Sequence, residues 1–412
     1  MSNVKIATGH EGSAKDQINA YFQRVKSGDM GALPAVGALI VLIGIFTAAA
    51  PEYFLRPLNV ANLFVQAAEL TMLAAAMVFV ILLAEIDLSA GVTGGVAMAV
   101  MFLLLRDGVS WPIALIVALV VGAAIGLLIG FFVAKVGVPS FVVTLGLFLG
   151  FQGLQLVMLG DGGLFKVDVA PINAIMNENL PTWLGWLVLI GGLALGILIT
   201  FLDRARRAKN GLPNRPISLV AAKYGAMAVL GGIIVAVMNV NRSANAFKPI
   251  EGVPIVIPIT LGILLIGGLI LDRTRFGRHL YAVGGNPEAA RRAGIKVAKI
   301  RIIAFIVCSA LSVISGLFHV SRLGAVEATA GRTIVLSGVA AAVVGGVSLF
   351  GGKGRLMHAA IGALVITIIA NGLGLLGWDA GMNFLVTGGV LILAATVDAL
   401  SRKRSSSSQI RV

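Results

Sequence analysis

The stretch PIALIVALVVGAAIGLLIGFFVA at residues 112–134 decides the fold of this chain. It contains no charged side chain, and a helix of this length crosses the hydrocarbon core of a bilayer, which is roughly 30 Å thick. Within it, Gly122, Gly126 and Gly130 recur at every fourth position and place small residues on one helix face. This stripe predicts close packing on another transmembrane helix, either within the chain or at a seam between two copies.

Apolar runs of this kind continue on both sides of residues 112–134. Of the 412 residues, 58% are hydrophobic and only 12% are charged, whereas soluble domains carry about 25% charged residues. The sequence therefore predicts an all-α, polytopic bundle of transmembrane helices, and it lacks the alternating pattern of an outer-membrane barrel. The expected spans lie near residues 34–51, 61–84, 88–105, 112–134, 140–159, 182–202, 219–238, 254–271, 302–320, 333–350, 356–376 and 383–399.

The number of crossings is expected to be ten to twelve. The runs at 88–105 and 333–350 are short and rich in Gly, so each is either a full span or a broken, re-entrant segment buried among its neighbours. With the N-terminus in the cytoplasm, most of the 32 Lys and Arg residues fall in cytoplasmic segments, as the positive-inside rule requires. The regions expected are a cytoplasmic N-terminal segment at 1–33, a transmembrane domain at 34–400 and a basic, Ser-rich cytoplasmic tail at 401–412.

The net charge of +14 favours contact with a lipid bilayer over contact with nucleic acid. Cationic loops meet anionic headgroups, and no basic patch is interleaved with aromatic side chains that stack on bases. Near the N-terminus, Ile18, Tyr21, Phe22 and Val25 have helical spacing. They predict a short amphipathic helix on the membrane surface, with a disordered leader as the alternative.

Ionisable side chains at membrane depth are costly, so each one is a candidate for function. Glu69, His319 and Asp398 lie inside the predicted spans. Asp87 and Ser89, within AEIDLSAG at residues 84–91, have two interpretations. They either cap the start of the Gly-rich run that follows or line a translocation path.

Three further polar residues, Thr144, Gln152 and Asn371, are candidates for the same path, although such groups also join helices by hydrogen bonds. The single Cys308 lies within a predicted span, which excludes a disulfide within the chain. Residues 161–181 are the longest outer segment. They are interpreted as a solvated, mildly acidic loop, with docking of a soluble partner as the alternative.

The most charged segment is DRTRFGRHLYAVGGNPEAARRAGIKVAKIR at residues 272–301, which holds eight Lys and Arg residues. These cations cannot lie in hydrocarbon, and the segment is far longer than a turn between two helices requires. It is therefore predicted to be a cytoplasmic segment that binds something other than lipid.

Two motifs in the chain look like known energy-coupling elements but fail on spacing. GGVSLFGGKGR at 345–355 resembles a phosphate-binding loop, but Val347 stands where the first Gly is required and Gly354 replaces the Ser or Thr that binds magnesium. LDRTRFGRH at 271–279 has the wrong spacing for the short loop of major-facilitator carriers. The chain is therefore expected to hold no ATPase, no catalytic residue and no cofactor or metal of its own.

Five segments together resemble the sugar permeases of bacterial ABC importers, the ribose, galactose and xylose group. The resemblance extends from about residue 60 to residue 400. It is carried by YAVGGNPEAARRAGI at 281–295, AEIDLSAG at 84–91, GVPSFVVTLG at 137–146, SRLGA at 321–325 and GGVSLFGGKG at 345–354.

The resemblance implies a permease of the bacterial inner membrane that pairs with a second copy of itself. Its other partners would be a periplasmic sugar-binding protein and a cytoplasmic ATP-binding subunit, which binds the ATP and Mg. It also implies a coupling element for that subunit at Gly284, Gly285, Asn286, Pro287, Glu288, Ala289, Ala290 and Arg291. Physical chemistry is compatible with this. Gly284 and Gly285 permit a tight turn, Asn286 can cap a short helix that begins at Pro287, and Glu288 suits the positive helix end.

Residues 203–253 have no counterpart in the shorter ribose-type members, and this length is more similar to the xylose-type permeases. The resemblance therefore favours a pentose such as D-xylose, with galactose and other monosaccharides next. Two alternatives stay open at this point. One is a secondary sugar transporter driven by ions, and the other is a passive channel or non-transporting assembly protein.

Overall fold

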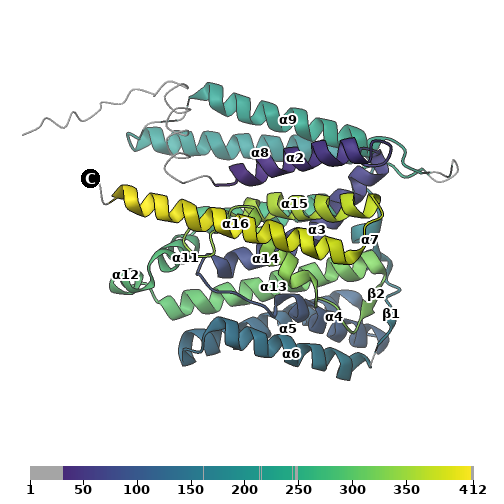
Figure 1. The fold of residues 1–412 in the computed structure, drawn as a ribbon, viewed down its shortest axis with the longest axis horizontal. Helices are drawn as coiled ribbons and strands as arrows, with labels where there is room; N and C mark the ends of the chain where they lie inside the picture. Colours follow the sequence, from purple (N-terminus) through teal and green to yellow (C-terminus); the bar gives the residue numbers. More distant parts are fainter. Residues whose placement is uncertain are drawn as a thin grey trace, which may run out of the picture. The chain divides into compact units, whose positions relative to one another are not determined.

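The computed structural model describes residues 31–160, 162–212, 214, 216–243, 245 and 249–409, with side chains described up to residue 400. The amphipathic helix predicted before residue 31 lies outside this part. The elements in chain order are α2 (Leu33–Ala49), α3 (Pro57–Ile81), α4 (Ala90–Arg106), α5 (Trp111–Phe131), the π-helical turn η1 (Phe132–Val136), α6 (Ser140–Leu159), β1 (Leu164–Lys166), α7 (Ala170–Asn177), α8 (Thr182–Lys209), α9 (Ile217–Asn239), α10 (Val256–Arg273), α11 (Arg275–Gly285), α12 (Pro287–Arg292), α13 (Val297–Leu323), β2 (Ala325–Glu327), α14 (Ile334–Val344), α15 (Leu356–Leu375) and α16 (Ala380–Gln409) (Figure 1).

The predicted all-α, polytopic architecture is confirmed. In the described part of the chain, nine helices are long and apolar enough to cross a membrane, and α2, α4 and α14 are shorter apolar helices. Each of the twelve predicted runs thus corresponds to a helix. The predicted bounds are least accurate for the run at 333–350, because α14 ends at Val344. It stops before Gly346, whose φ of +102° is incompatible with a right-handed helix.

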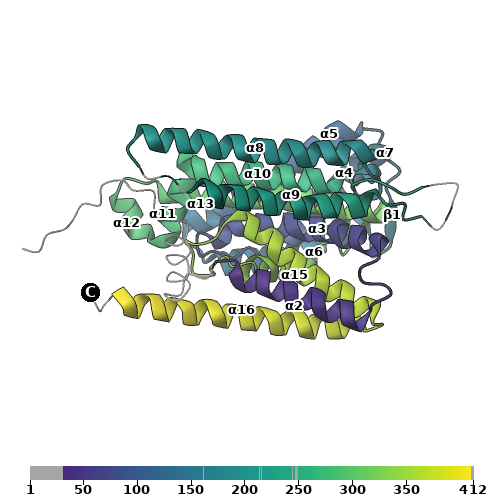
Figure 2. The same cartoon turned by 90° about the horizontal axis from the view of Figure 1, so that it is seen from above.

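The chain divides into two compact units, and residues 179–253 belong to the smaller one. Its helices α8 and α9 lie side by side and antiparallel (Figures 1 and 2). The Tyr224 hydroxyl of α9 donates to the carbonyl of Gly196 on α8 at 2.6 Å and lies 2.7 Å from the Thr200 hydroxyl. Gly196 therefore serves the contact between these two helices, since it leaves room for the Tyr224 ring.

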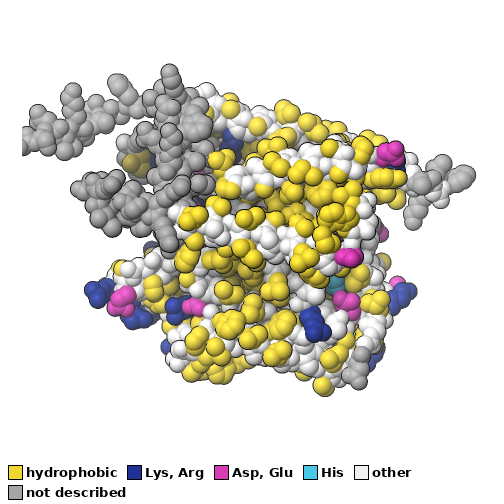
Figure 3. Space-filling model, viewed as in Figure 1, with side chains coloured by type: hydrophobic (Ala, Val, Ile, Leu, Met, Phe, Trp, Pro, Cys, Tyr) yellow, Lys and Arg dark blue, Asp and Glu magenta, His cyan; other side chains and the backbone are white. Residues whose placement is uncertain are grey.

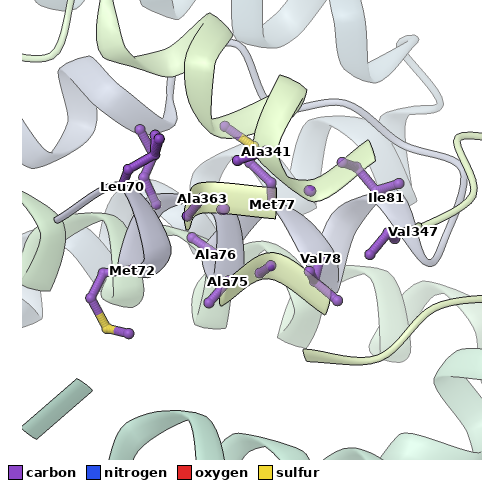
Figure 4. Packing of buried hydrophobic residues seen from close by; sticks show 14 of the residues in the cluster. Leu70, Met72, Ala75, Ala76, Met77, Val78, Ile81, Ala341, Val347 and Ala363 are labelled. Atoms are coloured by element: carbon purple, nitrogen blue, oxygen red, sulfur yellow. The ribbon is translucent and has the colours of Figure 1, made fainter. Parts of the chain in front are cut away.

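The larger unit comprises residues 31–178 and 254–400, and its centre is α3. Most of α3 is buried against α13, α14 and α15. Figure 4 shows part of this core, with Ala75 and Met77 of α3 near Ala341 of α14 and Ala363 of α15. On the face shown in Figure 3, hydrophobic side chains cover the middle and charged side chains gather toward the helix ends, as a surrounding bilayer requires.

The glycine stripe of α5 packs inside the chain, so its interpretation as a seam between copies is wrong. A Cβ at Gly126 would lie 2.5 Å from the Phe305 carbonyl oxygen, and one at Gly130 would lie 2.7 Å from Cα of Ile302. Both contacts are with α13. The stripe thus lets the backbones of α5 and α13 approach closely. Helices associate by such packing in a membrane, because the hydrophobic effect does not drive them together in lipid.

Residues 162–181, within the predicted solvated loop, form regular elements. Their strand β1 pairs antiparallel with β2, with Leu164 opposite Glu327, and α7 follows. Met176 of α7 donates its N–H to the Ser321 hydroxyl at the end of α13. Sequence inspection missed these strands because each has only three residues, too few to show an alternating pattern.

Candidate functional site

The charged segment at 272–301 folds into two short helices, α11 and α12. As predicted, α12 begins at Pro287 and Asn286 is its N-cap, whose Oδ1 accepts a hydrogen bond from the Ala289 N–H at 2.9 Å. Glu288 in the first turn forms ion pairs with Arg291 and Arg292 at 3.0 and 3.6 Å. These side chains are exposed, so α12 is a small capped helix that presents charge to the surroundings.

Gly284 and Gly285 do not form the tight turn that was predicted, because both belong to the last turn of α11. Gly284 is needed for close approach instead. A Cβ there would lie 1.7 Å from the carbonyl oxygen of Leu82, the residue that ends α3. A Cβ at Gly285 would contact nothing within 4 Å. The coupling element predicted from sequence therefore contacts the end of α3 directly, through Gly284.

The Gly-rich segment 345–355 holds α11 in this position. Gly352 donates its N–H to the same Leu82 carbonyl at 2.9 Å, and the Tyr281 hydroxyl donates to the carbonyl of Gly354 at 2.8 Å. Burial raises the pKa of Tyr281 to about 12, with a further contribution from Asp272, so the hydroxyl remains a donor at physiological pH. Ser348 in the same segment donates to Asp398 of α16 at 3.0 Å.

An ion pair joins the start of α13 to the chain just after α3. The Arg301 guanidinium lies 3.3 Å from the Glu85 carboxylate, and both side chains are largely buried. The end of α3 is thus in contact with α11 through Gly284, and the chain that follows it is paired with the start of α13 through Arg301.

Asp87, Ser89 and Thr144 stabilise the turn between α3 and α4. Asp87 is fully buried, and its Oδ1 accepts from the Ser89 N–H at 2.9 Å and the Ser89 hydroxyl at 2.6 Å. Thr144 donates to backbone carbonyls, that of Ser140 at 2.9 Å and that of Ile86 at 3.3 Å. These bonds close a turn just before α4, whose N-cap Ser89 makes no side-chain capping hydrogen bond, and the pathway role of Asp87 and Ser89 stays a prediction.

The other two pathway candidates also have no place in the cavity described below. Asn371 of α15 exchanges two hydrogen bonds with Asn59 of α3, at 2.9 and 3.0 Å, which joins these helices. Gln152 of α6 is half-buried, and its Nε2 has no hydrogen-bond partner.

A cavity beside Glu69, near the middle of α3, brings together side chains that the sequence had singled out only in part. Glu69 and Leu82 are separated by roughly 20 Å along the helix, at 1.5 Å per residue. The cavity has a volume of about 20 Å³, room for roughly one water molecule. It is lined by Glu69, Leu73, Gly91, Gly95, Met98, Ser312, Ser315, Gly316, His319, Val320, Ala330, Gly331 and Ile334.

Beside this cavity, a chain of ionisable groups connects α3, α13 and β2. Nδ1 of His319 lies 2.9 Å from Oε1 of Glu69, and Nε2 lies 3.3 Å from Oε1 of Glu327. Arg322 Nη2 lies 3.3 Å from the other oxygen of Glu69. The Arg322 cation thus accompanies the buried carboxylate of Glu69, as a charge at this depth requires.

Glu69 and His319 were recognised in the sequence as ionisable groups at membrane depth, but their contact was not. They are 250 positions apart, and no spacing rule connects two separate spans. Arg322 and Glu327 were missed for another reason, because both fall where the sequence suggests an outer loop. Glu327 belongs to β2, which could not be found from the sequence, and Arg322 lies in the last turn of α13.

Comparison with known proteins agrees with the motifs quoted above. The family described as branched-chain amino acid transport system, permease component, matches residues 59–395. The xylose transport system permease protein XylH of Escherichia coli is 34% identical over 98% of each chain, and that of Haemophilus influenzae is 34% identical over 89% of this chain and 96% of its own. The ribose import permease protein RbsC of Escherichia coli is 32% identical over 88% of this chain and 91% of its own.

No solved structure matches the fold at a significant level. The family match covers most of the chain, and the relatives align over nearly their entire lengths. With its long apolar helices, the protein is a multi-pass membrane protein and a transport component rather than an enzyme. The chain belongs to the family of branched-chain amino acid transport system permease components.

Proposed function

We propose that this protein is the permease subunit of an ATP-driven importer that carries a monosaccharide, D-xylose in the first place, across the bacterial inner membrane. It works with a cytoplasmic ATP-binding subunit, which binds ATP and Mg, and with a periplasmic sugar-binding protein. A second copy of the permease completes the translocation unit. Both chain termini and the α11–α12 segment face the cytoplasm, as the Lys and Arg distribution predicts.

The observation that carries this proposal is the 34% identity to the Escherichia coli xylose permease over 98% of both chains. The family description names branched-chain amino acids, whereas the curated relatives with high coverage are named for xylose and ribose. Similarity over the full length is the more specific guide to substrate class. It favours a sugar, and the two pentose permeases favour a pentose among sugars.

The contacts of α11 and α12 support a mechanism of alternating access. The capped helix α12 is a rigid, exposed element that fits a groove on the ATP-binding subunit. When that subunit closes on ATP, displacement of α12 moves α11, and the Gly284–Leu82 contact passes the movement to α3. Because Glu69 lies near the middle of α3, the cavity between α3, α4 and α13 then changes its access to the two sides.

The ion-driven secondary transporter is not supported, because the relatives that match over high coverage are permease components of transport systems. A passive channel is also disfavoured. The same relatives are named as transport-system and import permeases, not as channels.

Reconstitution into lipid vesicles tests the proposal. We expect vesicles that contain the permease with its ATP-binding subunit to accumulate xylose when ATP is supplied on the cytoplasmic side and loaded binding protein on the other. The permease alone should neither hydrolyse ATP nor accumulate sugar. Uptake by the permease alone that is abolished by an ionophore would refute the proposal in favour of ion coupling.

A further inference from the structure

The connection between α3 and α4, residues 82–89 (the 82–89 turn), contacts parts of the chain that are far apart in sequence. The coupling element and the Gly-rich segment both reach its backbone. A Cβ at Gly351 would lie 2.7 Å from the Gly284 carbonyl oxygen and 3.0 Å from the backbone nitrogen of Ala84. It would also lie 3.0 Å from the Leu82 carbonyl oxygen. The backbones of α11, the Gly-rich segment and the turn therefore pack directly on one another.

The same turn is bonded to two spans, α6 and α13. The Ile86 N–H donates to the Ser140 hydroxyl at 3.4 Å, and the Thr144 hydroxyl donates to the Ile86 carbonyl at 3.3 Å. Both of these side chains belong to α6. The Cys308 thiol of α13 donates to the Asp87 carboxylate at 3.7 Å. The 82–89 turn thus lies between the coupling element and two helices of the bundle.

The backbone of the turn begins with a defined helix cap. Ala84 has a φ of +59° and is the one non-glycine residue with a positive φ in the described part of the chain. The Glu85 N–H bonds to the Val80 carbonyl at 3.1 Å, and the Ala84 N–H bonds to the Ile81 carbonyl at 2.8 Å. These are the two hydrogen bonds of a Schellman motif, which ends a helix and fixes the direction of the chain that follows. The motif thereby sets the position of Glu85.

Glu85 is paired with Arg301 near the start of α13. Arg301 Nε lies 3.3 Å from Glu85 Oε1, and the exposed fractions of the two side chains are 29% and 13%. This Nε has no hydrogen-bond partner among the described residues, so the contact is electrostatic. A largely buried ion pair contributes little to stability, because desolvation of both charges offsets their attraction. Its main effect is on position, since separating the partners leaves each charge without compensation.

We propose that Glu85 and Arg301 are positioning residues for energy coupling. Their ion pair makes α13 follow the 82–89 turn when the coupling element is displaced, so that the displacement reaches more than α3. Because α13 packs against α3, α4 and α5, a change in its position alters the centre of the larger unit. This inference rests on the proposed function and goes beyond it, because it assigns the residues that carry the movement into the bundle.

The ratio of sugar transported to ATP hydrolysed, measured in vesicles that contain the complete transporter, tests the proposal. In Glu85→Gln and in Arg301→Met the ratio should fall roughly tenfold, because removal of one partner leaves the other charge without compensation. Arg301→Lys keeps the cation and should retain a ratio within about twofold of the wild type, since the contact uses no bidentate hydrogen bonds. Loss of folded permease lowers uptake and hydrolysis together, so this ratio reports coupling and not stability.

The double variant Glu85→Gln/Arg301→Met separates positioning from folding. It leaves neither charge unpaired, so it should fold even where a single variant does not, with a melting temperature close to that of the wild type. Its ratio should nevertheless be as low as that of either single variant. Lys299→Gln is the matched control, because it removes a cation from the same end of α13 and Lys299 is exposed. Its ratio should equal that of the wild type.

A wild-type ratio in the folded double variant would overturn the assignment of Glu85 and Arg301. An equal loss of coupling in Lys299→Gln would also overturn it, because the loss would then follow from charge and not from the pair. Failure of the wild-type complex to accumulate sugar with ATP is a different result. It would refute the proposed function itself, and this inference with it.

Discussion

At the scale of single residues, glycines have three different uses in this protein. Gly126 permits contact between helices, Gly284 permits contact of α11 with the end of α3, and Gly346 adopts a positive φ that ends α14. The first use was predictable from the spacing of four residues. The second was not, since a Gly-Gly pair before Asn-Pro is equally typical of a turn.

Gly126→Ala should destabilise the folded protein. The new Cβ would lie 2.5 Å from the Phe305 carbonyl oxygen and 2.6 Å from Cα of Ile306, so α5 and α13 must separate. Overpacking of this kind costs about 1–3 kcal/mol, more than the roughly 1 kcal/mol that Ala gains over Gly in a helix. The melting temperature in detergent should fall by several degrees.

Gly146→Ala in α6 is the control, because a Cβ there contacts nothing within 4 Å. The helical preference of Ala should leave its melting temperature equal to or above that of the wild type. Equal melting temperatures for Gly126→Ala and Gly146→Ala would show that the α5–α13 contact is looser than described.

Tyr281→Phe should weaken the contact between α11 and the 345–355 segment by the same amount across physiological pH. The change removes one hydrogen bond, worth about 1 kcal/mol. The folded-state pKa of about 12 lies above the ordinary value of roughly 10. The hydroxyl bond is therefore fully present below pH 10 and is lost only as the pH rises toward 12. The melting temperature of Tyr281→Phe should lie below that of the wild type by the same amount at pH 6 and at pH 9. A larger difference at pH 9 would contradict the raised pKa of Tyr281.

At the scale of elements, the long helices were predictable and the short ones were not. Twelve apolar runs gave twelve helices because hydrocarbon leaves the backbone no other conformation. For α12, the residues Asn286, Pro287 and Glu288 were sufficient to predict where the helix begins, because a cap acts within one turn. The strands β1 and β2 depend on pairing between residues 164 and 327, which no local pattern encodes.

The contact between α11 and the end of α3 should determine how well ATP hydrolysis is coupled to sugar uptake. In Gly284→Ala, a Cβ 1.7 Å from the Leu82 carbonyl oxygen displaces α11, and Gly352 would lose its own hydrogen bond to that oxygen. The ratio of sugar transported to ATP hydrolysed in reconstituted vesicles should fall at least tenfold, which corresponds to about 1.4 kcal/mol.

Gly285→Ala, one position further along, is the matched control, because its Cβ contacts nothing within 4 Å. It should retain a ratio within about twofold of the wild type, as surface substitutions usually change free energies by no more than about 0.5 kcal/mol. Equal ratios for the two variants would mean that the contact with Leu82 does not transmit the movement.

At the scale of the whole molecule, family and fold could be obtained from sequence, whereas the site could not. The coupling element lies in one continuous segment, so its motif is visible along the chain. The Glu69 cavity draws its lining from α3, α4, α13, the segment before α14 and the first residue of α14. The sequence identified Glu69 and His319 as candidates only because each is ionisable at membrane depth. Their contacts with each other and with Arg322 and Glu327 became visible only in the folded structure.

Crosslinking tests the central claim that α12 receives force from a separate ATP-binding subunit. Cys308 is buried in α13, so Ala289→Cys places the one readily accessible thiol of the described residues on exposed α12. Asp168→Cys places a comparable thiol on the far side of the membrane, according to the predicted orientation. In the assembled transporter, we predict that a thiol-directed crosslinker joins residue 289, but not residue 168, to the ATP-binding subunit. Crosslinking of residue 168 and not of residue 289 would contradict the account.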